Sequence, residues 1–355
     1  MAGNKEFIDA LDAIEKERNI SKDVMIEAIE TSLLQACKNQ FGKSENIKVQ
    51  INRNTGTIGV FAEKTIVEEV EDPVTQITLD EAAQKFPRKK LAVGDSVNIE
   101  VTPKNFDRIS AQKAKQTVIQ KVREEERKVL YDQYSELAHQ VVTGVVQRYI
   151  GKNISINLGK VDAILTEADQ MPGEHFRARG DERIKLYVTE VKDSTKGPRI
   201  SVSRTHKDLL RRLFEAEVAE IADGTVQIHG IVREPGSRSK MSVSSNDPNV
   251  DARGACIGNN SERVNAIVNE LNGEKIDIVY WSEDPKEYIE QALSPAKVSS
   301  VEVDEFEKTA KVIVPDFQLS LAIGKEGQNV RLAAKLTGYK IDIRSESQVR
   351  EGDEF

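Results

Sequence analysis

Two short loops in the C-terminal third carry a residue pattern suited to holding a phosphate group. One loop, Gly324-Lys325-Glu326-Gly327, lies between a short helix expected to end near Ile323 and a second helix. Glycine has no Cβ, so its backbone can approach a ligand closely and take a positive φ angle. The amides and the positive dipole end of the following helix favour phosphate oxygens. The pattern predicts a clamp for the backbone of about four nucleotides.

Two side chains just beyond this loop extend the predicted site. Gln328 follows the loop directly, and Arg331 lies one turn further along the expected helix, where it adds positive charge. A GxxG pattern alone is a weak signal, because any tight turn between two helices can show it. A turn without a ligand therefore stays the alternative.

The other loop, Gly258-Asn259-Asn260-Ser261, departs from the pattern, because serine replaces the second glycine. Asparagine tolerates a left-handed backbone better than most residues. We predict that this loop keeps its fold and holds nucleic acid more weakly, with Arg263 contributing from its rim. The alternative is that this copy of the repeated unit has a structural role only and sets the distance between the domains on either side of it.

Both loops belong to a duplicated unit. The segments that begin at Ile257 and Ile323 both start with Ile-Gly and both end with Lys-Ile-Asp-Ile. Each copy is predicted to run helix, strand, strand, helix, loop, helix, strand. Two copies do not make a solenoid, which needs at least three repeats. We therefore predict two compact tandem domains, and the short joint from Tyr280 predicts that they share an interface and one continuous nucleic-acid surface.

The segment before the repeats predicts a small barrel. Five short alternating strands, separated by glycine-containing turns, are expected between residues 134 and 205, as in a five-stranded oligonucleotide-binding barrel. Single-strand binding combines aromatic platforms with basic grooves, so Tyr149 and Phe176 are candidates for stacking, and Lys152 and Arg204 for phosphate contact. The alternative for the domain is a structural or SH3-like barrel, and the alternative for Tyr149 or Phe176 is a place in the barrel core.

Residues 1–133 predict an α+β head. Two helices, with Ser21 as a cap and Gly42 as a stop, precede a hairpin at Asn54-Thr-Gly56 and a strand in "GDSVNIEVTP". A long helix without Gly or Pro then leads out of the head as a stiff connector.

Composition limits the functions open to the chain. Its 355 residues suggest several domains, and its net charge of −8 means that nucleic-acid contacts must come from local features. No apolar run approaches the roughly 18 residues of a membrane span, so we expect a cytoplasmic protein without membrane contact. Cys37 and Cys256 are expected to be core thiols.

The sequence predicts neither a metal site nor a cofactor. The four histidines lack metal-ligand spacing, and no Walker loop or HExxH motif occurs. Asp247 and Asp251 predict a capped turn rather than a Mg²⁺ site. An RNA-degrading or RNA-modifying enzyme would need a catalytic block, and no carboxylates pair convincingly with a base or a metal set.

The order of these modules resembles the NusA family of bacterial transcription termination and antitermination factors. The resemblance covers nearly the whole chain and rests on "RNTGTIGVFAEK", "VTPKNFDRISAQKAKQ", "LGKVDAIL", "KGPRISVSRTH" and "VIVPDFQLSLAIGKEGQNVRLAAKLTGYKIDI". It implies an S1-type barrel at 134–205 and type II KH domains at 206–281 and 282–347. The residues after them, 348–355, are expected to form an acidic tail. Departures gather in the first KH domain, where Ala252-Arg253 and the serine-containing loop replace the family's residues.

The resemblance also implies partners and a mode of action. It implies a monomeric, non-catalytic elongation factor that binds RNA polymerase through its head and single-stranded nascent RNA through its barrel and KH domains. Other Nus or antitermination factors are further implied partners. A ribosome-associated KH/S1 assembly factor is the alternative from another class.

Overall fold

The computed structural model describes most of the chain, namely residues 5–41, 46–87, 91–102, 106–176 and 182–350. The chain divides into two compact units, residues 1–130 and 131–355. The helix stop expected at Gly42 and the last residues of the acidic tail, 351–355, lie outside the described residues. Within the described ranges, no helix has both the length and the apolar composition needed to cross a bilayer.

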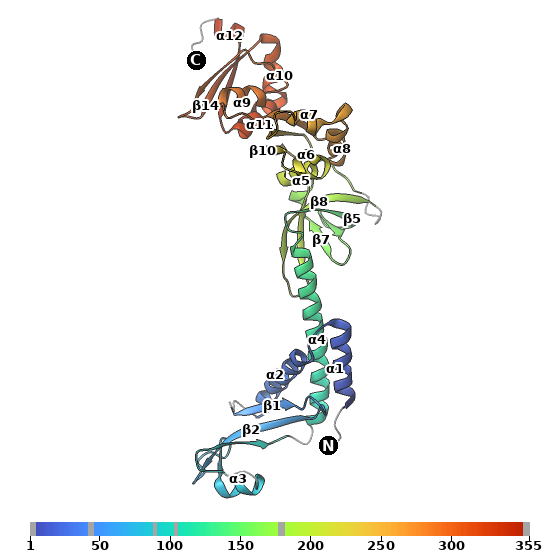
Figure 1. Ribbon diagram of the computed structural model, residues 1–355, viewed down its shortest axis with the longest axis vertical. Helices are drawn as coiled ribbons and strands as arrows, with labels where there is room; N and C mark the ends of the chain where they lie inside the picture. Colours follow the sequence, from blue (N-terminus) through green and yellow to red (C-terminus); the bar gives the residue numbers. More distant parts are fainter. Residues whose placement is uncertain (1–4, 42–45, 88–90, 103–105, 177–181, 351–355) are drawn as a thin grey trace. The chain divides into compact units, whose positions relative to one another are not determined.

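The N-terminal unit is an α+β head built from helices and a four-stranded sheet (Figure 1). Its first elements are α1 (Lys5–Arg18), α2 (Lys22–Phe41), β1 (Ile47–Ile51), β2 (Ile58–Val67), β3 (Gln76–Thr78), α3 (Leu79–Lys85) and β4 (Ser96–Glu100). β1 and β2 form the predicted hairpin, with Ile51 opposite Ile58. Gly56 takes a φ of 68° in the turn between them, a conformation that glycine adopts without steric cost.

The long helix predicted after the sheet is α4 (Phe106–Ser135). Phe106 and Ala114 are buried in the same apolar cluster as Met25 and Ile29 of α2. Its C-terminal end contacts the barrel, where the Tyr134 hydroxyl donates to the carbonyl of Leu158 at 3.0 Å. The same helix therefore contributes side chains to the core of one unit and to a hydrogen bond within the other.

The second unit begins with the predicted five-stranded barrel, which is closed in the order β5-β6-β7-β9-β8. Its strands are β5 (Val141–Ile150), β6 (Asn153–Asn157), β7 (Asp162–Leu165), β8 (Arg183–Lys192) and β9 (Arg199–Ser203). Gly144 permits the close crossing of strands, because a Cβ there would lie 2.2 Å from the Ile156 side chain. This barrel confirms the predicted fold class.

Two KH domains follow and repeat one topology. The first contains α5 (Lys207–Glu217), α6 (Ala219–Ala222), β10 (Val226–Glu234), β11 (Arg238–Ser245), α7 (Ala252–Ile257), α8 (Glu262–Glu270) and β12 (Lys275–Tyr280). The second contains α9 (Pro285–Ala292), β13 (Ser300–Asp304), β14 (Thr309–Val314), α10 (Leu319–Ile323), α11 (Gln328–Thr337) and β15 (Lys340–Ser345), and α12 (Glu346–Arg350) follows it. In each sheet the first two strands pair antiparallel and the third pairs parallel to the second.

The two KH domains contact each other through the sheet of the first. Helix α11 lies against β10 and β11, and Gly230 makes room for it, since a Cβ there would lie 3.0 Å from Leu336. Tyr288 of α9 donates a hydrogen bond to Ser242 of β11 at 2.9 Å. The shared interface predicted from the short joint is therefore present.

Candidate nucleic-acid interface

The two GxxG-type loops have the same backbone conformation. Their first glycines have φ and ψ of 75° and 174° at Gly258 and of 76° and 171° at Gly324. The fourth residues are both left-handed, with φ of 61° at Ser261 and 72° at Gly327. A non-glycine residue in this region costs about 1–2 kcal/mol, so Ser261 keeps the loop shape at an energetic cost.

The first glycine of each loop is required by packing. A Cβ on Gly324 would lie 2.8 Å from the backbone nitrogen of Asn329, and one on Gly258 would lie 2.8 Å from Cγ of Arg263. By contrast, the nearest atom to a Cβ on Gly327 is 4.0 Å away, in the Val330 side chain. Space alone therefore does not require glycine in the fourth position.

A polar side chain ties the two helices of each loop together. In the second domain, the buried amide of Asn329 donates to the carbonyls of Ala322 and Leu293, both at 3.0 Å. In the first domain, Arg263 donates to the Ala255 carbonyl at 2.7 Å and to Glu220 at 2.9 Å. Arg263 thus lies beside its loop, as predicted, but its guanidinium already has partners within the domain.

The loops differ in charge rather than in shape. In the second loop, Lys325 and Glu326 are both exposed, so a cation and an anion stand side by side ahead of α11. Asn259 and Asn260 are exposed at the equivalent places in the first loop, which therefore carries no charge of its own. The positive end of the following helix is present in both loops, and only the second adds a lysine to it.

A groove of about 200 Å³ lies beside the first loop. Ser261 lines it together with the apolar side chains of Ile257, Val264, Ile276 and Ile278 and with Arg253, Asp277, Ser294 and Pro295. A small, open hollow with a mixed polar and apolar lining therefore lies beside the first loop.

Gln328 and Arg331 meet a carboxylate of the other domain. Arg331 forms an ion pair with Glu234 of β10 at 2.7 Å, and Gln328 donates to the same carboxylate at 2.8 Å. Arg331 is the main cause that lowers the pKa of Glu234, and the same pair raises the pKa of Arg331. Both predicted binding residues therefore lie beside the loop, but in contact with the first KH domain.

In the barrel, the two predicted aromatic residues lie together but differ in exposure. Tyr149 is 44% exposed, whereas Phe176 is only 8% exposed. The Tyr149 hydroxyl donates to the carbonyl of Phe176 at 3.1 Å. Lys152 is exposed and pairs with Glu167 at 2.8 Å. Tyr149 and Lys152 are thus available at the surface, whereas Phe176 occupies the core position that was its alternative.

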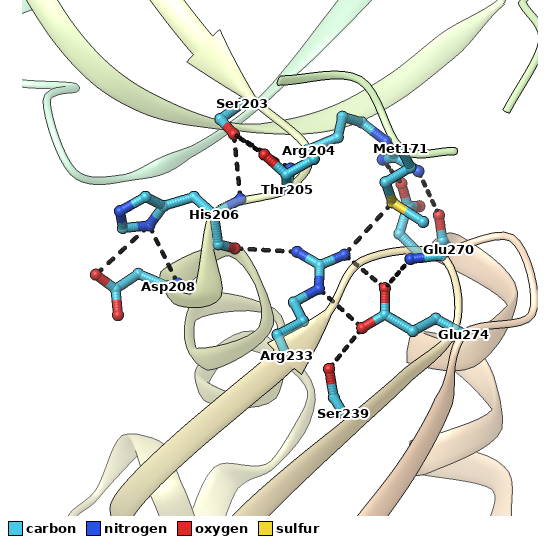
Figure 2. Close-up of polar contacts among 11 residues, drawn as sticks. Met171, Ser203, Arg204, Thr205, His206, Asp208, Arg233, Ser239, Glu270 and Glu274 are labelled. Atoms are coloured by element: carbon cyan, nitrogen blue, oxygen red, sulfur yellow. Dashed lines mark hydrogen bonds and ion pairs between the residues drawn. The ribbon is translucent and has the colours of Figure 1, made fainter. Parts of the chain in front are cut away.

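Arg204 does not lie on the surface of the barrel and is only 1% exposed. Its guanidinium donates to Glu174 at 3.0 Å, to the Lys185 carbonyl at 2.8 Å, and to both the side chain and the carbonyl of Glu270 in α8. Figure 2 shows this arginine at the junction of the barrel and the first KH domain. The expected phosphate contact is therefore corrected to a buried link between the two domains.

A second buried ion pair lies within the first KH domain beside this junction, and its arginine, Arg233, reaches Sδ of Met171 in the barrel at 3.4 Å. Arg233 of β10 forms an ion pair with Glu274 at 2.8 Å, and the two side chains are 2% and 0% exposed. Arg233 also donates to the His206 carbonyl at 3.0 Å (Figure 2). Ser239 donates to Glu274 at 2.6 Å. The sequence alone does not reveal this pair, because its members lie 41 residues apart and nothing local marks them as partners.

An apolar cluster completes the junction. Met171 and Tyr187 of the barrel belong to the same buried cluster as Leu209 and Phe214 of α5. The Tyr187 ring also stacks on His206, with ring centroids 4.6 Å apart. Barrel and first KH domain thus share part of one core.

Among the residues that the structure describes, no group of three or more His, Cys, Asp or Glu side chains is placed to bind a metal ion. Asp251 instead caps α7 by accepting from the Arg253 amide at 3.1 Å, as the sequence predicts. Cys37 and Cys256 are buried, and burial raises the pKa of Cys256 to about 12.

A closed five-stranded barrel followed by two KH folds with GxxG-type loops defines a class of multidomain KH proteins. Family models agree with this architecture: the NusA N-terminal domain matches residues 6–128, the NusA-like first KH domain 204–281, and the NusA-like second KH domain 285–351. The chain belongs to the NusA family.

Relatives match the chain over nearly its full length. The transcription termination/antitermination protein NusA of Halalkalibacterium halodurans is 56% identical, with 98% of this chain and 90% of that protein covered. NusA of Bacillus subtilis is 54% identical over 98% of this chain and 93% of that protein, and NusA of Thermus thermophilus is 42% identical over 99% and 92%.

Proposed function

We propose that this protein is a non-catalytic transcription elongation factor that modulates pausing, termination and antitermination. The head binds RNA polymerase, and the barrel and KH domains bind single-stranded nascent RNA. It acts in the cytoplasm as a monomer and meets other antitermination factors on the elongation complex. The proposal rests on near full-length similarity to proteins named for transcription termination and antitermination.

The conformation of the second loop carries the RNA-binding part of the proposal. Gly324 and Gly327 take positive φ angles at the start of α11, and Lys325 is exposed beside them. Backbone amides, a helix N-terminus and a lysine together suit a phosphate. Tyr149 adds an exposed ring for a base in the barrel.

An RNA-binding comparison of two glycines tests this part. Gly327 and Gly338 flank α11 with φ angles of 72° and 78°, and neither has an atom closer than 4.0 Å to an added Cβ. We expect Gly327→Asp in the full chain to weaken binding of an unstructured single-stranded RNA about tenfold, because a carboxylate would face the phosphate. Gly338→Asp, the matched control, should leave binding close to wild type.

In vitro transcription on a template with an intrinsic terminator tests the rest. The full chain, added to a bacterial RNA polymerase, should change pause lifetime and the fraction of terminated transcripts, and Gly327→Asp should reduce the change. Absence of any effect on transcription, together with co-sedimentation with ribosomal subunits, would favour the ribosome-associated alternative instead.

A further inference from the structure

Helix α11 of the second KH domain surrounds a carboxylate of the first KH domain with donors. Both nitrogens of one edge of the Arg331 guanidinium contact Glu234, with Nε 2.7 Å from Oε1 and Nη2 3.1 Å from Oε2. Gln328 Nε2 lies 2.8 Å from Oε2 of the same group. Lys335, one turn further along α11, is close enough to lower the pKa of Glu234 as well.

This arrangement has the geometry of a phosphate site. A guanidinium edge that meets two oxygens is the contact that arginine makes with carboxylates and phosphates alike. The Gln328 amide supplies an uncharged donor, and Lys335 supplies a further positive charge. The donors on α11 therefore suit any anion with two oxygens side by side.

The same arginine touches the loop. Arg331 Nη1 donates to the carbonyl of Glu326 at 2.9 Å, and Glu326 is the left-handed third residue of the loop, with a φ of 54°. A phosphate held by the loop amides would therefore lie close to the Arg331 guanidinium. The Glu234 carboxylate, bound to that guanidinium, places a negative charge beside the second loop.

Exposure makes this pair displaceable. The side chains of Arg331 and Glu234 are 45% and 25% exposed, and ion pairs open to solvent contribute little to stability. The preceding residue makes the contrast clear, because Arg233 and Glu274 are 2% and 0% exposed. Two adjacent residues of β10 thus form one buried ion pair within the first KH domain and one partly exposed ion pair to the second.

We propose that Gln328, Arg331 and Lys335 form an anion site for which an RNA phosphate competes with Glu234. The inference rests on the proposed RNA-binding function and adds its regulation, since RNA on the second loop would break the contact between Glu234 and α11. Glu234 thereby weakens RNA binding by the second KH domain.

Neutralising the competitor tests the proposal. In the full chain, Glu234→Gln should bind an unstructured single-stranded RNA about three- to tenfold more tightly at low salt. Freeing one arginine for one more phosphate should also steepen the dependence of log K on log salt by about 0.7. Glu307→Gln, which removes an exposed carboxylate on the β13–β14 turn of the second domain, is the control for net charge and should change the affinity little.

A double-mutant cycle separates competition from a general charge effect. In an Arg331→Gln background, Glu234→Gln should tighten binding much less than in the wild-type background, because the arginine that Glu234 withholds is gone. Unchanged or weaker binding by Glu234→Gln, while the wild-type chain binds RNA in a salt-dependent way, would overturn this inference alone. If neither the wild type nor any variant binds RNA, the proposed function fails with it.

Discussion

The two KH domains share a loop conformation but not loop chemistry, and this difference separates what the fold needs from what a ligand needs. Gly258 and Gly324 are fixed by atoms 2.8 Å from any added Cβ. The fourth position tolerates either serine or glycine in a left-handed conformation. The first glycine is therefore needed for the turn between the helices. The residue in the fourth position can vary without loss of the fold, so it can change how closely a ligand approaches the loop.

The two KH domains also differ in how deeply they bury a lysine that lies opposite an aspartate on the neighbouring strand. In the first domain Lys240 lies opposite Asp277, and in the second Lys311 lies opposite Asp342. Lys240 is fully buried and donates to the Ser294 carbonyl of the following segment at 2.7 Å, and this burial lowers its pKa. Lys311 is partly exposed. The same pair thus anchors the joint in one domain and stays near the surface in the other.

The largest expected effect follows from this contrast. Lys240→Ala would remove the fully buried ammonium from Asp277, which keeps only Arg238 at 3.6 Å, and would take the donor from the Ser294 carbonyl. We expect this to lower the free energy of unfolding by about 3 kcal/mol. Lys311→Ala should cost about 1 kcal/mol or less. Urea unfolding of both full-length variants, followed by circular dichroism, measures the two costs. Equal losses of unfolding free energy would show that burial of Lys240 against the segment that contains Ser294 does not stabilise the fold.

Substitution of the first loop glycines should have the next largest effect. Gly324→Ala forces a Cβ against backbone and imposes a positive φ on alanine, so we expect a loss of about 2–3 kcal/mol. Gly258→Ala should cost less, because the obstructing atoms belong to the longer Arg263 side chain. Thermal unfolding of the two variants ranks them, and a larger loss for Gly258→Ala would contradict this account of the packing.

Charge placed in the fourth position should reveal which loop holds RNA. Gly327→Asp should weaken single-stranded RNA binding about tenfold, whereas Ser261→Asp should weaken it about threefold or less, because the uncharged first loop contributes less to phosphate binding. A salt titration by fluorescence anisotropy gives both values for the full chain. Similar losses in the two variants would mean that the loops work equally, despite their different sequences.

The smallest effects should come from exchanging the fourth residues. Ser261→Gly relieves a left-handed serine but adds freedom to the unfolded chain, so its net gain should be about 0.5 kcal/mol. Gly327→Ser should lose a similar amount. In RNA binding, Ser261→Gly should tighten the complex and Gly327→Ser should weaken it. Opposite signs in the binding data would show that serine contributes a contact of its own.

Sequence patterns predicted most of the fold because the determining signals are local. Alternation over a few residues marks each barrel strand, and the spacing of apolar residues marks the helices on both sides of each loop. β3 and α3 were missed, although Thr78 caps α3 by accepting from the Glu81 amide at 3.3 Å, and such a cap can be read from a sequence. The domain boundaries at single-residue level stay predictions.

The candidate site was harder to predict, because a sequence shows a charge but not its partner. Arg204, Arg263 and Arg331 were all assigned to RNA, and all three have carboxylate partners within the second unit. Those partners lie at least 30 residues away in the chain. The loop glycines were easier to recognise, because their requirement is set by the few residues around them.

The buried arginines at the junction of the barrel and the first KH domain have a consequence for the length of an RNA site. With Arg204 and Arg233 both closed off from water, the exposed Tyr149 ring and the Gly258–Ser261 loop are joined by a stiff connection rather than a free linker. An RNA that touched both would have to span a set number of nucleotides. Because this connection fixes the distance between the two sites, inserting or removing nucleotides between two contact sequences should weaken RNA binding as much as changing those sequences does.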